Sequence, residues 1–205
     1  LTHLTFEYYS IFNQNVSRLP STLTHLTFGY TFNQDVSNLP PSLTHLTFGY
    51  TFNQDVLNLP FSLTYLTFGT DFNKNVSNLP PSLTHLTFGC TFNQDVSNLP
   101  PSLTHLTFAE KFNQDISRLP HNIIHLTLGS NFNQECNIPP NVKYLFLNCN
   151  NPHIIDSLPN SIMELELGDD FNLEINNLPT SIKKLVIGSH YIADLNCLPD
   201  FIEEL

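Results

Sequence analysis

Histidine recurs at one place in a repeating pattern along the first two thirds of the chain. The series runs through His3, His25, His45, His85, His105 and His125, with Tyr65 in the one place where histidine is missing. Imidazole is the commonest metal ligand in proteins, so a zinc or nickel site is one chemistry that the series suggests. A line of parallel rings, however, does not converge on one ion, and no cysteine or carboxylate joins it before Glu164 and Glu166. We therefore expect no bound metal and favour a solvated face of stacked rings that came with duplication of the unit.

A second chemistry open to these histidines is proton binding. Free imidazole titrates near pH ~6.5, so the rings would become charged together as the pH falls below this value. Repulsion along the series would then loosen the structure. A pH-dependent role is thus an alternative to a purely structural one.

Acidic side chains form another series, which consists of Asp35, Asp55, Asp95, Asp115 and Glu135, with Asn15 and Asn75 at the equivalent place. Stacked carboxylates can bind calcium in repeat proteins. Here each repeat supplies one acidic residue and no glycine-rich loop, so we favour capping of a turn by the side chain.

Catalytic motifs are absent from the sequence. It contains no Gly-x-Ser-x-Gly, Gly-x-Gly-x-x-Gly, phosphate-binding loop or Cys-x-x-Cys. Most of the histidines belong to the series described above. We therefore expect a protein that is not an enzyme and needs no cofactor.

The residues of both series are positioned by a unit of about twenty residues that repeats from end to end. One unit spans residues 43–62, and units begin at Leu1, Leu23, Leu43, Leu63, Leu83, Leu103, Ile123, Val142, Ile162 and Ile182. The first unit has two extra residues and the seventh lacks one, both outside the Leu-x-x-Leu-x-Phe stretch. Such a regular period is typical of a solenoid, in which each unit stacks on the next.

Within a unit, polar and apolar residues alternate at positions 3 to 7, counted from the first leucine. This period of two predicts a short strand with positions 4 and 6 inward and positions 3 and 5 on the other face. Glycine then allows a tight turn, and a proline such as Pro60 excludes a helix from the return segment. We expect columns of phenylalanine in the core and a ladder of stacked asparagines in the turns.

The outward face of the strands is nearly invariant up to Pro120 and diversifies after residue 140. The new side chains combine two aromatic residues, two carboxylates and lysines, which is typical of interface hot spots. We expect partner contacts at Tyr144, Phe146, Glu164, Glu166 and Lys184, with His45, His85, His105 and His125 as a secondary surface. Plain drift in the terminal repeats is the alternative.

The Leu-x-x-Leu-x-Phe stretch with its Leu-Pro-x-x-Leu junction resembles a leucine-rich repeat. The segment Gly29 to Val36, Gly-Tyr-Thr-Phe-Asn-Gln-Asp-Val, more closely resembles the FNIP repeat of slime-mould and giant-virus proteins. The eighth unit departs from it, with Asn151-Pro152 in place of Phe-Asn. The resemblance implies a right-handed, leucine-rich-repeat-like coil, a β-rich solenoid with a parallel concave sheet and extended convex returns.

The same resemblance implies a protein-interaction scaffold. Giant-virus relatives with an upstream F-box would make the repeats a substrate receptor for a ubiquitin-ligase adaptor, although no F-box is visible in this sequence. The rival function is structural, in which near-identical coils stack end to end into a fibre or a surface layer. Both readings expect a protein partner, which in the structural case is another copy of the chain.

Composition narrows the partners and the compartment. The net charge of −11 supplies no basic patch for nucleic acid, and no apolar run is long enough to cross a membrane. The four cysteines, Cys90, Cys136, Cys149 and Cys197, fall on different coils and are expected to be free thiols. We therefore expect a reducing compartment, the cytoplasm, or the host cytoplasm if the protein is viral. The unbroken period predicts one domain over residues 1–205, and both ends look cut through a repeat, as in a fragment of a longer chain.

Overall fold

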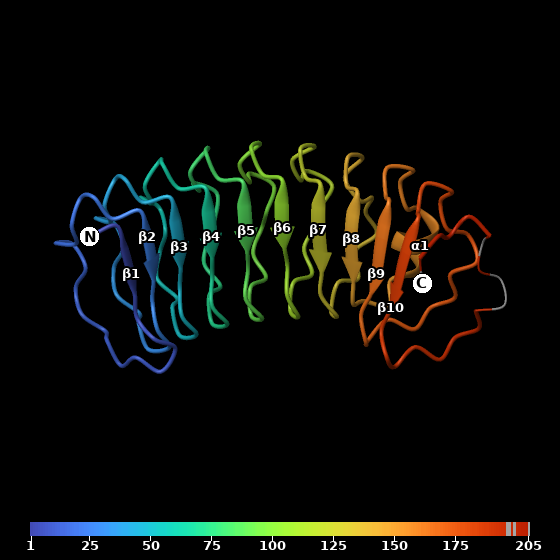
Figure 1. Cartoon of the computed structure of the whole chain (residues 1–205), viewed down its shortest axis with the longest axis horizontal. Coiled ribbons are helices and arrows are strands. Elements are labelled where there is room, and N and C mark those ends of the chain that lie inside the picture. Colours follow the sequence, from blue (N-terminus) through green and yellow to red (C-terminus); the bar gives the residue numbers. More distant parts are fainter. Residues whose placement is uncertain (196–197, 199, 205) are drawn as a thin grey trace.

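The computed structural model is a coil in which each repeat forms one turn, and it describes residues 1–195, 198 and 200–204 (Figure 1). Over these residues, a single sheet of ten parallel strands runs along the molecule, with the strands in chain order. They are β1 (His3–Thr5), β2 (His25–Thr27), β3 (His45–Thr47), β4 (Tyr65–Thr67), β5 (His85–Thr87), β6 (His105–Thr107), β7 (His125–Leu128), β8 (Tyr144–Leu147), β9 (Glu164–Leu167) and β10 (Lys184–Ile187). The predicted β-rich solenoid is confirmed.

The register of the sheet places each strand residue beside its own equivalent in the next turn. His25 pairs with His45 where the spacing is regular, and His3 pairs with His25 across the longer first unit. His125 pairs with Tyr144 across the shortened seventh unit. The insertion and the deletion are therefore absorbed in the loops, as predicted.

The core consists of columns of equivalent apolar side chains, which the alternation along the strands predicts to face inward. Leu46 and Phe48 of β3 and its turn are buried, as is Phe52 of the return segment. The Phe48 and Phe52 rings stack within one turn, with centroids 3.7 Å apart. The equivalent residues repeat these contacts along the molecule, so the core is one continuous cluster.

The spacing of equivalent rings shows which side of the coil is concave. On the solvent-exposed face of the sheet, the rings of His85 and His105 have centroids 4.0 Å apart. In the core, the distance from Phe88 to Phe108 is 5.5 Å, and in the return segment the distance from Phe92 to Phe112 is 6.1 Å. The turns therefore fan apart with distance behind the sheet, and the face that bears the histidines is concave.

Close backbone approach explains the glycine after the strand. A Cβ atom on Gly69 would lie 1.9 Å from the carbonyl oxygen of Gly49, a distance that no side chain tolerates. In the sixth turn, Ala109 replaces the glycine. In the next turn, a Cβ atom on Gly129 would lie 2.3 Å from the carbonyl oxygen of Ala109. The glycines thus allow successive turns to pack at strand spacing.

The asparagine ladder forms between turns, as expected. The Asn93 side-chain oxygen accepts hydrogen bonds from the Asn113 backbone amide and from Gln114 Nε2, both at 2.9 Å. The side chain of one turn therefore satisfies the backbone of the next. Similar bonds repeat from Asn13 to Asn133.

The prediction of wholly extended return segments is wrong in the eighth turn. This turn contains a short helix, α1 (Pro152–Asp156), whose first turn is capped by the Asn151 side chain, which accepts a hydrogen bond from the His153 amide. Proline has no backbone N–H group, but at the start of a helix this group would have no hydrogen-bond partner within the helix, so proline is tolerated there. Asn151 replaces the usual phenylalanine, and Ile154 and Ile155 of the helix are buried in the core.

Candidate binding surface on the concave face

Two side chains of each strand point out from the concave face, at positions 3 and 5 of the repeat. From β1 to β7 these are histidine or tyrosine followed by threonine. They become Tyr144 and Phe146 on β8, then Glu164 and Glu166 on β9. The sheet therefore has one face in solvent and the other packed against the core, as the alternation along each strand requires.

The rings at position 3 form one stacked column, which we call the aromatic ladder. It runs through His3, His25, His45, Tyr65, His85, His105, His125 and Tyr144. Neighbouring centroids are 4.0 Å apart at the shortest, between His85 and His105, and 4.3 Å at the longest, between His45 and Tyr65. Tyr144 belongs to the ladder, although the sequence placed it only in the diversified patch. The two predicted surfaces are therefore continuous.

Several ladder histidines share a hydrogen bond between Nδ1 and the hydroxyl of the preceding threonine. The Thr104 hydroxyl donates to the Thr84 carbonyl oxygen at 3.2 Å and lies 2.9 Å from His105 Nδ1. A hydroxyl has a single proton, so when that proton goes to the Thr84 carbonyl, it is Nδ1 of His105 that donates to the hydroxyl. Nε2 of the neutral ring is then an unprotonated acceptor. The same relation holds at His25, His45 and His85.

The surroundings of the ladder favour the neutral form of its imidazole rings. Partial burial lowers the pKa of His105, and burial together with neighbouring histidines lowers the pKa of His45 and of His85. The pKa of His25 and of His125 is also lowered, with burial again the largest cause. Among the described residues, no group of three or more histidine, cysteine or carboxylate side chains is arranged to hold a metal ion.

The acidic series lies elsewhere, in the turns of the return segments. Asp115 accepts hydrogen bonds from the backbone amide and the hydroxyl of Ser117, both at 2.8 Å. Asp35 and Asp95 contact Ser37 and Ser97 in the same way. These bonds lower the pKa of each of the three carboxyl groups. The structure therefore confirms the capping role at these positions.

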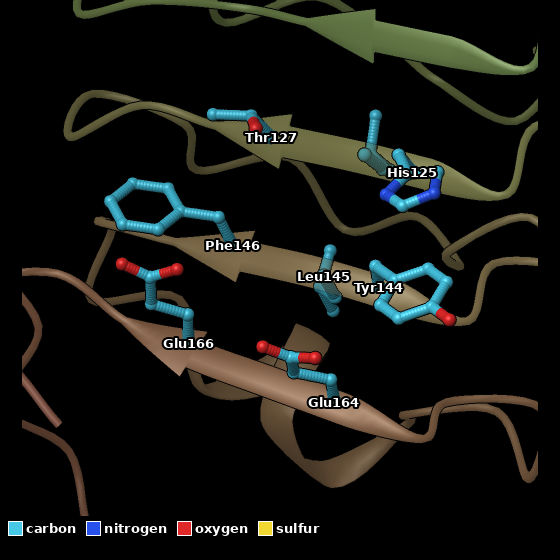
Figure 2. Close-up of a pocket in the computed structure, with 8 residues that line it drawn as sticks. His125, Thr127, Tyr144, Leu145, Phe146, Glu164 and Glu166 are labelled. Atoms are coloured by element: carbon cyan, nitrogen blue, oxygen red, sulfur yellow. The ribbon is translucent and has the colours of Figure 1, made fainter. Parts of the chain in front are cut away.

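Beside the end of the ladder, the concave face has a hollow of about 420 Å³ (Figure 2). Its lining comes from β7, β8 and β9 and consists of His125, Leu126, Thr127, Tyr144, Leu145, Phe146, Glu164 and Glu166. Four of the five residues predicted for the partner patch thus meet at one hollow. The fifth, Lys184, lies on the next strand.

Lys184 is held by the acidic side of this hollow. Its Nζ lies 2.8 Å from Glu164 Oε1, and both side chains are partly exposed. Hydrogen bonding and the charge of Glu164 raise the pKa of Lys184, with smaller contributions from Glu204 and Glu166. Over the part of the chain that the structure describes, the Glu166 carboxylate has no hydrogen bond or ion pair, and this residue is exposed.

A second hollow of about 410 Å³, which the sequence did not predict, adjoins the first. It is lined by Phe146, Asn148, Glu166, Leu167, Gly168, Asp169, Asp170, Val186 and Gly188. Asp169 and Asp170 come after β9 and Gly168, at positions 8 and 9 of the repeat, where the earlier units have varied residues that include Tyr50, Cys90 and Glu110. No earlier unit has two adjacent acidic residues at these positions, and this pair was the available signal.

The repeated block decides the family. The model of the FNIP Repeat matches residues 12–51, 35–71, 52–91, 72–111, 112–150, 135–170 and 149–190. This chain belongs to the FNIP repeat family. No curated protein matches it by sequence.

Solved structures share the fold of these FNIP repeats. CroV588, a giant-virus protein described as a novel circular LRR protein, has a TM-score of 0.76 and 39% sequence identity, and the match covers 98% of this chain and 36% of CroV588. This chain therefore spans about a third of the length of that relative.

Two bacterial proteins are similar in fold alone. YopM from Yersinia enterocolitica has a TM-score of 0.59 and 23% identity, over 92% of this chain and 47% of YopM. The internalin InlF from Listeria monocytogenes has a TM-score of 0.54 and 16% identity, over 90% of this chain and 67% of InlF. The FNIP coil is thus a leucine-rich-repeat-like solenoid.

Two further expectations concern membrane association and cysteine chemistry. Within the described residues, no helix is long and apolar enough to span a membrane. Cys90, Cys136 and Cys149 are free thiols, whereas Cys197 lies outside the described residues. Burial raises the pKa of Cys149 to about 11, so this thiol is protonated and unreactive.

Proposed function

We propose that this FNIP repeat chain binds a protein partner across the concave face of its sheet. The observation that supports this most is the continuity of that face, since Tyr144 is both the last ring of the aromatic ladder and a wall of the larger hollow. Leucine-rich-repeat-like scaffolds generally bind proteins, and the family is typically without catalytic activity. The strands β2 to β9 that form the middle of the concave surface are each paired on both sides, which favours a rigid surface.

The proposed contacts fall into two groups. Tyr144, Phe146, Glu164, Glu166 and Lys184 provide a mixed aromatic and charged centre of the kind that dominates binding energy. His45, His85, His105 and His125 extend the contact along the ladder. A narrower form of this proposal follows from the family resemblance. In it, the chain is the substrate receptor of a ubiquitin-ligase adaptor in the cytoplasm of a host cell.

An affinity capture with two matched variants tests the proposal. Alanine replacement of Tyr144, Phe146, Glu164, Glu166 and Lys184 together should abolish capture of partners from cell extract. A control variant should alter the return side equally, with alanine at five exposed positions such as Asn58 and Asn98. Equal capture by the two variants would contradict the proposal.

A second candidate function is assembly into a ring or fibre of copies. It is supported by the fanning of the turns and by the similarity to a protein described as circular. Electron micrographs over a range of protein concentrations test it. Rings or fibres that grow with concentration would favour assembly, and a monomer at every concentration would exclude it.

A further inference from the structure

We infer that the two hollows around Phe146 bind an extended, basic segment of a protein partner, with a lysine or arginine side chain set between the Phe146 ring and the Glu166 carboxylate. This inference rests on the proposed function and adds the chemistry of the partner. It concerns the stretch of the concave face formed by β8, β9 and β10.

Phe146 and Glu166 divide the surface into two adjoining hollows, since both residues line each of them. The Phe146 ring extends towards the next turn, where a Cβ atom on Gly168 would lie 2.9 Å from its Cζ. Glycine at 168 therefore leaves room both for the Asn148 side chain, which a Cβ atom would meet first, and for the Phe146 ring. Figure 2 shows the Phe146 ring and the Glu166 carboxylate beside each other on neighbouring strands.

Negative charge is concentrated at this place. Positions 3 and 5 of β1 to β7 have no acidic residue, whereas β9 has two, and Asp169 and Asp170 follow in the wall of the second hollow. Hydrogen bonds from Ser189 lower the pKa of Asp169, so this carboxyl group is ionised at neutral pH. The one cation on this face of β9 and β10, Lys184, is already paired with Glu164.

An aromatic face beside an unpaired carboxylate is chemistry suited to a cation. Lysine and arginine gain from the ring quadrupole and from the charge of Glu166, and their aliphatic stems can pack on Phe146. An acidic segment would be repelled, and an apolar one would desolvate Glu166 without a partner. The net charge of −11 also steers basic partners towards the molecule.

The test uses synthetic peptides in which threonine alternates with one test residue, so that the test residues share one face of an extended chain. The test residue is lysine, arginine, norleucine or glutamate; norleucine keeps the aliphatic stem of lysine without its charge. Binding to the whole chain is followed by backbone amide NMR shifts at low salt. We expect the lysine and arginine peptides to bind at least about fivefold more tightly than the norleucine peptide, with shifts in β8 to β10.

Two variants with the same change of net charge locate the effect. Glu166→Gln should abolish the preference for lysine over norleucine, whereas Glu110→Gln, at an exposed turn beyond β6, should leave it unchanged. Equal binding of the lysine and norleucine peptides, preference for the glutamate peptide, or equal loss in both variants would overturn the inference. Shifts located outside β8 to β10 would do the same.

Failure of this inference can be told apart from failure of the proposed function. If partners captured from extract depend on the concave face but have no basic segment there, the function stands and the inference is wrong. If capture is unchanged when the concave face is altered, the function is wrong whatever the peptides show.

Discussion

The rings of His125 and Tyr144 stack with centroids 4.2 Å apart and planes 6° apart, across the one repeat that is shorter than the others. This contact joins the uniform part of the concave face to the part that varies. A deletion in the loop leaves it intact because the pairing of β7 with β8 remains in register. The ladder and the patch consequently form one surface.

The ladder histidines should make stability depend on pH. The pKa of His25, His45, His85, His105 and His125 is lowered in the folded chain, so below pH ~6.5 the unfolded chain binds protons more tightly. Their stabilising effect is complete above this pH and is lost as the pH falls through the folded pKa values. We expect a Tm several degrees lower at about pH 5 than at about pH 7.5.

Replacement of ladder histidines provides the control for this dependence. A variant with glutamine at His85 and His105 should lose part of the difference in Tm between the two pH values. Glu164 opposes the shift at His125 by its charge, so that site should contribute less. A Tm that is unchanged or higher at the acidic pH would contradict the account.

Thr104→Val should release the tautomer of His105. The valine keeps the shape of threonine but removes the hydroxyl that lies within hydrogen-bond distance of both the Thr84 carbonyl oxygen and His105 Nδ1. Nitrogen NMR shifts of the imidazole should show His105 as the Nδ1-protonated form in the original chain and as a mixture in the variant. Thr107→Val, which alters a threonine at position 5, should leave the His105 spectrum unchanged.

Gly69→Ala should destabilise the coil. The added methyl group would meet the Gly49 carbonyl oxygen, and relief requires the two turns to separate, at a cost of about 1–3 kcal/mol. Ala109→Gly, which makes the sixth turn like its neighbours, should change stability by less than about 1 kcal/mol. Urea unfolding followed by circular dichroism compares the two, and equal midpoints would exclude the packing argument.

Asn93→Ala should destabilise the return side. It removes the acceptor of two hydrogen bonds and leaves the Asn113 amide without its partner, at a cost of about 1–3 kcal/mol. Asn98→Ala, at an exposed position of the same turn, is the matched control. The ladder would be dispensable if both variants melted at the same temperature.

Much of this architecture could be predicted from the sequence, because a repeat imposes the same environment on each copy. The inward position of Phe48, the outward position of His45 and the capping by Asp115 all follow from one unit and its periodicity. Helix α1 could not be predicted in this way. There, Asn151 replaces a core phenylalanine, and the local solution depends on what else fills the space.

The candidate surface was only partly predictable for a similar reason. Alternation places Tyr144, Phe146, Glu164 and Glu166 on one face, but it does not show that Tyr144 completes the ladder. Nor does it show that Phe146 lies over Gly168 and forms a second hollow. These relations join neighbouring turns, and they depend on side-chain direction as well as on position in the unit.

Site-specific photo-crosslinking tests the central claim most directly. A benzoylphenylalanine in place of Thr127 lies on the concave face, and the same group in place of Asn98 lies on the return side. Both variants would be irradiated in the same cell extract and their adducts identified by mass spectrometry. We predict that a defined protein adduct forms from position 127 and not from position 98. Adducts only from position 98 would show that the concave face is not the recognition surface.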